Sequence, residues 1–202
     1  AAGASEDFTF TAAAGDTIVF GAAEANAASP LSLRVQLINP LGAVLSNQIG
    51  AVGTGSALTS VAQSGTYTIR VQNTAGTGAF NVSMVRAPGA QTFGADDGAL
   101  ASGEFRAASI GSGDLDVFTI SGTANASLQT ALAEETGAPL TLSKLVIGPA
   151  GQVVANTAGA TMESNLITLP ATGTYTIIVY DTGFDAVGNY TLSAVSIPAT
   201  QT

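Results

Sequence analysis

The sequence predicts an all-β protein that contains two tandem copies of one antiparallel unit. Apolar and polar residues alternate with a period of two, as in 66–72, which is typical of a strand with one buried face. Glycine and proline interrupt such segments at short intervals, which favours a sandwich or a barrel. The phrase Gly-Thr-Tyr-Thr-Ile stands at 65–69 and again at 173–177, which indicates that the unit itself is repeated.

The first copy, which we place at residues 1–87, contains several half-buried strands. Residues 8–10 read Phe-Thr-Phe, and residues 31–37 alternate leucine and valine with polar side chains. The turn Asn-Pro-Leu-Gly at 39–42 follows, where proline presets φ and glycine closes the turn. Alternation returns in 79–84, so we expect antiparallel strands with one face in a core.

The second copy, which we place at 99–202, repeats these strands in the same order. Residues 139–154 match 30–45 at a spacing of 109, and 188–195 match 78–85 at a spacing of 110. Residues 88–98 between the copies are rich in proline, glycine and aspartate, so we expect a linker there.

The two copies differ at their beginnings. Residues 99–110 form an additional strand-like segment ahead of 118–120, the segment that matches 8–10. The first copy shows no such segment, so its first strand is expected to be missing. Either the sequence begins inside this unit or the unit is simply shorter. The alternative is that a neighbouring subunit completes it, because an unpaired strand edge is a template for another strand.

Composition excludes several functional classes. The chain of 202 residues has a net charge of −9 and only five basic residues, so it lacks the basic stripe of a nucleic-acid-binding protein. No run of 18 apolar residues occurs, and we expect no membrane span. Histidine and cysteine are absent, which excludes Ser-His-Asp and Cys-His sets. We therefore expect no catalytic residues and no enzyme.

Acidic clusters remain as candidate metal ligands. Calcium binds several carboxylate and carbonyl oxygens, and the best candidate set is Asp114 and Asp116, joined by Asp96 and Asp97 from the linker. A second candidate is the turn that contains Asp181 and Asp185. The alternative for both is that these are solvated acids in loops.

One lysine and two tyrosines carry specific expectations. Lys144 occupies the position of Val35, which points inward in the first copy. A β-bulge near Ser143 and Lys144 would turn the lysine outward, and the alternative is a buried or interface lysine paired with an acid. Tyr67 and Tyr175 each follow a Gly-Thr turn, and we expect core-edge rings whose hydroxyls bond nearby backbone.

Four segments together resemble a known family. They are Gly-Asp-Leu-Asp-Val-Phe at 113–118, Gly-Pro-Ala-Gly at 148–151, and the Gly-Thr-Tyr-Thr-Ile-Ile-Val and Gly-Asn-Tyr strands at 173–179 and 188–190. This order is similar to the bacterial pre-peptidase C-terminal domain, and both copies resemble it. The resemblance implies jelly-roll-like β-sandwiches, export and a non-catalytic role, and some relatives bind calcium or fibrous polymers. The first copy departs from the pattern, because Ala4 stands where the second has Asp114.

Two functions follow as hypotheses. The first is a secreted structural protein of the bacterial cell surface that associates with itself into a filament, layer or matrix. Its Ser/Thr-rich sheet faces could pack without a large cost of charge desolvation. The alternative is an accessory module of a larger secreted enzyme, such as a peptidase, that binds an extracellular polymer or matrix.

Overall fold

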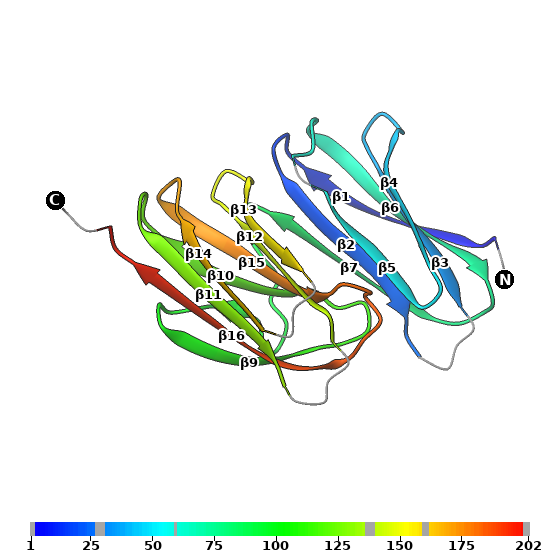
Figure 1. Cartoon of the computed structure of the whole chain (residues 1–202). Coiled ribbons are helices and arrows are strands. Elements are labelled where there is room, and N and C mark those ends of the chain that lie inside the picture. Colours follow the sequence, from blue (N-terminus) through cyan, green and yellow to red (C-terminus); the bar gives the residue numbers. More distant parts are fainter. Residues whose placement is uncertain (1–2, 27–30, 59, 136–139, 159–161, 200–202) are drawn as a thin grey trace.

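The computed structural model describes residues 3–26, 31–58, 60–135, 140–158 and 162–199 (Figure 1). Strands β1 to β16 are the regular elements of this part of the chain. No helix occurs among the described residues, and hence none that is long and apolar enough to cross a membrane.

Unit one consists of two sheets that enclose a core. The first has the order β1-β6-β3-β4 and the second the order β5-β2-β7. Every strand pair in these sheets is antiparallel. Phe20, Leu33 and Val35 are among the buried residues between them. The strands are β1 (Ser5–Ala12), β2 (Thr17–Glu24), β3 (Ser32–Ile38), β4 (Val44–Gly50), β5 (Gly53–Leu58), β6 (Gly65–Ala75) and β7 (Phe80–Ala87).

Unit two repeats this arrangement with two additional strands. Its sheets have the orders β13-β12-β15-β10-β8 and β14-β11-β16-β9. The pairing is antiparallel except between β8 and β10. The strands are β8 (Gly98–Ala99), β9 (Glu104–Ile110), β10 (Asp116–Gly122), β11 (Ser127–Glu134), β12 (Leu142–Ile147), β13 (Val153–Ala158), β14 (Met162–Thr168), β15 (Gly173–Asp181) and β16 (Gly188–Ile197). The expected all-β fold with two antiparallel sandwiches is confirmed.

The strands of the two units correspond one to one, apart from β8 and β9. Strands β1 to β7 match β10 to β16 in both chain order and sheet order. In unit two, β8 lies beside β10 and β9 lies beside β16. In unit one, β1 pairs with β6 and β7 pairs with β2, and no described strand lies on their other sides. Both β1 and β7 are therefore edge strands.

The two units pack against each other through sheet faces, as the side-by-side ribbons in Figure 1 show. The outer face of β5-β2-β7 contributes Val19 and Val85, and the outer face of β12 contributes Leu145 and Ile147. The side chain of Phe184 of unit two also belongs to this cluster. Side chains on both faces of β2 and β12 are consequently buried.

Glycines in unit one make room for Phe184. A Cβ added at Gly21 or Gly55 would collide with the ring of Phe184, and one at Gly53 would collide with its backbone carbonyl. The ring is 3% exposed and stacks on Tyr180 with the centroids 5.2 Å apart. Sheet β5-β2-β7 therefore presents a glycine socket that accepts an aromatic side chain from unit two.

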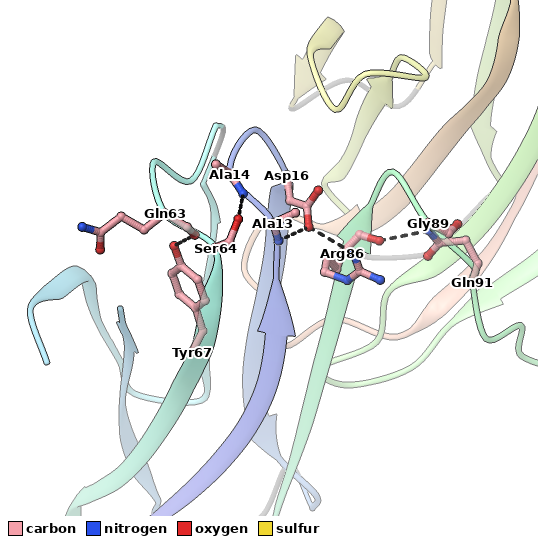
Figure 2. A network of polar contacts seen from close by, with 9 residues as sticks. All are labelled: Ala13, Ala14, Asp16, Gln63, Ser64, Tyr67, Arg86, Gly89 and Gln91. Carbon is pink, nitrogen blue, oxygen red and sulfur yellow. Dashed lines mark hydrogen bonds and ion pairs between the residues drawn. The ribbon is translucent and has the colours of Figure 1, made fainter. Parts of the chain in front are cut away.

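Polar contacts secure the end of unit one that leads into unit two (Figure 2). Arg86, near the end of β7, donates to the buried carboxylate of Asp16 at 3.0 Å. The backbone N–H of Ala13 donates to the same carboxylate oxygen at 2.8 Å. Gln91 donates its amide to the Arg86 carbonyl at 3.0 Å. Thr17 also donates to the carbonyl of Gly151 in unit two at 2.7 Å.

The expectation that a β-bulge turns Lys144 outward is wrong, and the alternative of a buried lysine is confirmed as far as its burial. The register of β12 shifts between Val146 and Ile147, and no shift occurs at Ser143 or Lys144. Lys144 is 0% exposed and lies in the alternation between Leu142 and Val146, which belong to the core of unit two. Leu145 and Ile147 on the other face of this strand are also apolar, because unit one covers that face.

The two tyrosines behave as expected. Tyr67 donates its hydroxyl to the Gln63 carbonyl at 2.7 Å, and Tyr175 donates to the Ala171 carbonyl at 2.6 Å. Both rings are buried. Each hydroxyl bonds to the residue four positions earlier, so it ties the preceding turn to the strand that follows.

Candidate functional site

The fold brings three of the four predicted metal ligands together. Carboxylate oxygens of Asp96, Asp97 and Asp116 lie within 4.8 Å of one another. Asp96 and Asp97 precede β8, whereas Asp116 begins β10, and the pairing of β8 with β10 draws the two segments together. Asp114 is not part of the group, because its carboxylate caps the local turn by accepting the N–H groups of Leu115 and Gly111.

Asp116 is the buried member of this cluster. It is 3% exposed, and the hydroxyl of Tyr190 donates to its Oδ2 at 2.5 Å. Burial raises the pKa of Asp116 to about 8, and the nearby charges of Asp114, Asp97 and Asp96 act in the same direction. Burial also raises the pKa of the Tyr190 hydroxyl. At neutral pH the Asp116 carboxyl therefore holds a proton unless a cation compensates its charge.

The other two carboxylates already have local partners. Asp96 accepts the N–H and the hydroxyl of Ser109 at 2.7 and 3.0 Å. Asp97 accepts the N–H of Gly94 at 2.8 Å, and its Oδ1 is buried without a hydrogen-bond partner in the described structure. Arg106 donates to the backbone carbonyls of Asp96 and Asp97 at 3.3 and 2.9 Å.

These residues fit a hard cation in part. Three carboxylates are the kind of ligand that calcium prefers, and the unpartnered Oδ1 of Asp97 could be one of them. Calcium takes about six to eight oxygen ligands, however, and Arg106 already donates to the backbone carbonyls of Asp96 and Asp97. Calcium at Asp96, Asp97 and Asp116 stays a prediction.

The second candidate is built differently. Asp181 is 3% exposed, and its Oδ2 accepts the N–H groups of Gly183, Asp185 and Ala186 at 3.0 to 3.3 Å. Its Oδ1 accepts the N–H of Thr141 at 2.9 Å. Four backbone donors thus occupy this carboxylate, which holds the turn together and carries Phe184 towards unit one.

A more distinctive feature lies on the side of unit one where β1 and β7 are edges. Phe8 is 37% exposed, whereas its counterpart Phe118 is 0% exposed. Phe80 is half-buried, whereas its counterpart Tyr190 is 0% exposed. Phe8 and Phe80 contact each other edge to face, with ring centroids 6.4 Å apart. Unit two closes this position with β9 and β8, whereas no described strand of unit one covers the equivalent position.

We call this opening, between the edges β1 and β7, the open seam. A cavity of about 150 Å³ lies in it and is lined by Glu6, Val71, Asn73 and Phe80, among others. The Oδ1 of Asn73 is buried there without a hydrogen-bond partner. Glu24 lies opposite Phe80 in the β2–β7 pair and thus on the same sheet face, and its buried Oε2 also has no partner.

The hydrogen-bonding groups of β7 also point into the seam. In an antiparallel pair, alternate residues bond the partner strand and the others point away. The Ala79 carbonyl accepts from Ala25 on the β2 side, while the Arg86 carbonyl accepts from Gln91 on the opposite side. Val82 and Met84 therefore direct their N–H and C=O groups away from β2. Their counterparts in β16, Leu192 and Ala194, pair with residues of β9.

Sequence reasoning expected one additional strand in 99–110, where the structure has the end of β8 and the whole of β9, and it did not identify the accessible core residues of unit one. Phe8 and Phe80 read as ordinary core residues because they follow the same alternation as their buried counterparts. Glu24 gave one signal, since an acid ends an otherwise apolar run at 18–23. Only the packing shows that this acid lies at the mouth of the core.

Comparisons with known proteins do not establish a family. No family model matches the chain, and no curated protein matches it. Among solved structures, the CUB1-EGF-CUB2 domain of human MASP-1/3 is 9% identical, with a TM-score of 0.27, and the match covers 96% of this chain and 94% of that one. The CBM22-1-CBM22-2 tandem domain from Paenibacillus barcinonensis Xyn10C is also 9% identical, with a TM-score of 0.26 and coverages of 96% and 83%. Scores this low carry no functional inference.

Proposed function

We propose that this chain is a non-enzymatic structural protein of the bacterial cell surface that assembles with copies of itself. The open seam carries this proposal. It combines an unpaired edge at β7 with partly exposed core residues and two buried acceptor oxygens that lack partners. A strand from a second copy would supply backbone donors, acceptors and apolar side chains at this position.

Unit two indicates what an added strand needs. Strand β9 runs antiparallel to β16 and places Ala108 opposite Tyr190 and Ile110 opposite Gly188. Ala108 and Ile110 are buried in the core of unit two. A complementing strand in unit one would thus run antiparallel to β7, with small or aliphatic side chains beside Phe80. A donor strand that lies elsewhere on the second copy makes the contact heterologous, and a heterologous contact can continue as a filament.

A proline substitution tests the seam directly. Val82→Pro removes an N–H that points away from β2, so the β2–β7 pairing keeps its hydrogen bonds while strand addition loses one. Val82→Ala is the matched control, because it trims the side chain but keeps the N–H. We expect filaments or sheets in negative-stain images of the unmodified protein and of Val82→Ala, and loss of this assembly in Val82→Pro.

The outcomes separate the hypotheses. A chain that sediments as a monomer at all accessible concentrations would contradict self-assembly and favour the accessory-module alternative. Assembly of Val82→Pro equal to that of the unmodified protein would exclude the seam as the contact. A synthetic peptide of residues 104–110 should also bind unit one and shorten the assemblies, whereas the same peptide with aspartate in place of Ala108 and Ile110 should not.

A further inference from the structure

The second surface of interest is the outer face of the sheet β14-β11-β16-β9. Leu128, Leu132 and Leu192 point into the core of unit two. Because side chains alternate along a strand, the neighbouring residues on β11 and β16 point outward. They include Gln129 and Ala131 on β11 and Ser193 and Val195 on β16. Phe105 on β9 and Leu166 on β14 complete this surface, which we call the uncharged face.

The uncharged face contains two strongly exposed apolar side chains. Phe105 is 80% exposed and Leu166 is 69% exposed. In the strand register Gln129 lies opposite both Leu166 and Val195, and Phe105 lies opposite Ser193, so these residues form one continuous surface. The described side chains beside Phe105 and Leu166 include no charged group, and carboxylates meet this face only at one end, where Glu135 accepts from Asn189 and Asp96 from Ser109. That composition is notable in a chain with a net charge of −9.

The equivalent face in unit one is already an interface. Val19 and Val85, the counterparts of Gln129 and Val195, are buried against unit two. This face of the fold thus packs on another sheet within the same chain. The uncharged face differs in one respect, because Ala131 stands where unit one has Gly21 of the socket for Phe184. It cannot receive Phe184 of another copy in the same way.

Charge decides which surface of a second copy fits the uncharged face. The other exposed sheet face, on β1-β6-β3-β4, contains the Arg70–Asp7 ion pair at 2.7 Å and also Arg34. Covering those groups would cost their desolvation. Packing the uncharged face on itself covers Phe105 and Leu166 without removing a charge from water.

We infer that two copies dock through their uncharged faces about a two-fold axis. Each copy places Phe105 and Leu166 on the sheet of the other, in the aligned sheet-on-sheet geometry of a sandwich. This contact is isologous and closes as a pair. It differs from strand addition at the open seam, which uses unit one and can propagate. The two contacts together would join filaments side by side.

The test measures the pair in the Val82→Pro background, where strand addition is blocked. Gln129→Lys places a charge at the centre of the uncharged face, and in a two-fold pair the two lysines approach each other. Thr9→Lys is the matched control on the exposed face of β1. Sedimentation equilibrium should show dimers of the background and of Thr9→Lys. For Gln129→Lys we expect the dissociation constant to rise by at least about tenfold.

Two results would overturn the inference: a monomeric background at millimolar concentration, or equal dissociation constants for Gln129→Lys and Thr9→Lys. Circular dichroism spectra of both variants should match the background, because both positions are exposed. Failure of the open seam gives a different result. In that case Val82→Pro still forms filaments. Negative-stain images of Gln129→Lys and Thr9→Lys then show whether the substitution at Gln129 abolishes the side-by-side pairing of these filaments.

Discussion

Asp116→Asn should remove most of the pH dependence of stability between pH 4 and pH 8. Burial raises the pKa of Asp116 from 3.8 to about 8 in the folded protein. Between these values the folded chain binds a proton that the unfolded chain has lost. The free energy of unfolding therefore falls as pH rises from about 4 to about 8. Asparagine has the shape of the protonated acid and carries no titrating proton.

The expected change in the free energy of unfolding follows from the difference between the pKa values of Asp116 in the unfolded and folded protein. A pKa difference of about 4 at about 1.4 kcal/mol for each pKa unit gives a ceiling of about 6 kcal/mol at pH 8. Urea unfolding followed by circular dichroism, in the presence of a chelator, should show nearly equal stability of the two proteins at pH 4. At pH 8 the variant should be more stable by several kcal/mol. Parallel pH profiles of the two proteins would refute the assignment of a buried, proton-binding Asp116.

The unmodified protein and Asp116→Asn also test whether calcium binds at this cluster. A cation at Asp96, Asp97 and Asp116 would favour the ionised form of Asp116 and so restore the stability that the unmodified protein loses at high pH. Added calcium should then raise its melting temperature at pH 8, and a chelator should reverse the rise. Asp116→Asn should respond less, because it offers a neutral ligand. A melting temperature that calcium leaves unchanged would remove this metal site from consideration.

Three further substitutions test the contacts of the scaffold. Phe184→Ala empties the glycine socket, and we expect a loss of about 3 kcal/mol, seen as earlier proteolysis between the units and a lower urea midpoint. Arg86→Met leaves the buried Asp16 carboxylate with only a backbone donor, which should cost about 1 to 2 kcal/mol and respond weakly to salt. Tyr67→Phe removes the bond to Gln63 and should lower stability by about 1 kcal/mol in thermal unfolding. Unchanged stability in any of the three would contradict the contact concerned.

Much of the scaffold could be predicted from local patterns. Strands with one buried face show alternation that survives in the sequence, as in β3, and the two tyrosines could be interpreted from their turns. Comparison of the two copies also predicted a strand within residues 99–110, where β9 lies. These features depend on the geometry of a single strand or on comparison of two copies, and neither requires knowledge of the packing.

The candidate sites were less accessible to prediction. Asp96 and Asp97 were grouped with Asp116 correctly, but Asp114 was included although it caps its own turn. Spacing along the chain cannot show which of two nearby carboxylates points towards a third. The burial that raises the pKa of Asp116 also arises from strands distant in sequence, as its bond to Tyr190 shows.

Sequence alone was sufficient to predict the strands and their duplication, because alternation and repetition are local properties. Tertiary structure alone decided which faces are covered. Strand β12 is buried on both sides because unit one packs on its outer face, whereas Lys144 lies on its inner face among the core residues of unit two. Phe8 and Phe118 occupy equivalent positions, yet one is accessible and the other buried. The burial of a side chain depends on its neighbours in space, and the sequence around Phe8 or Phe118 does not include those neighbours.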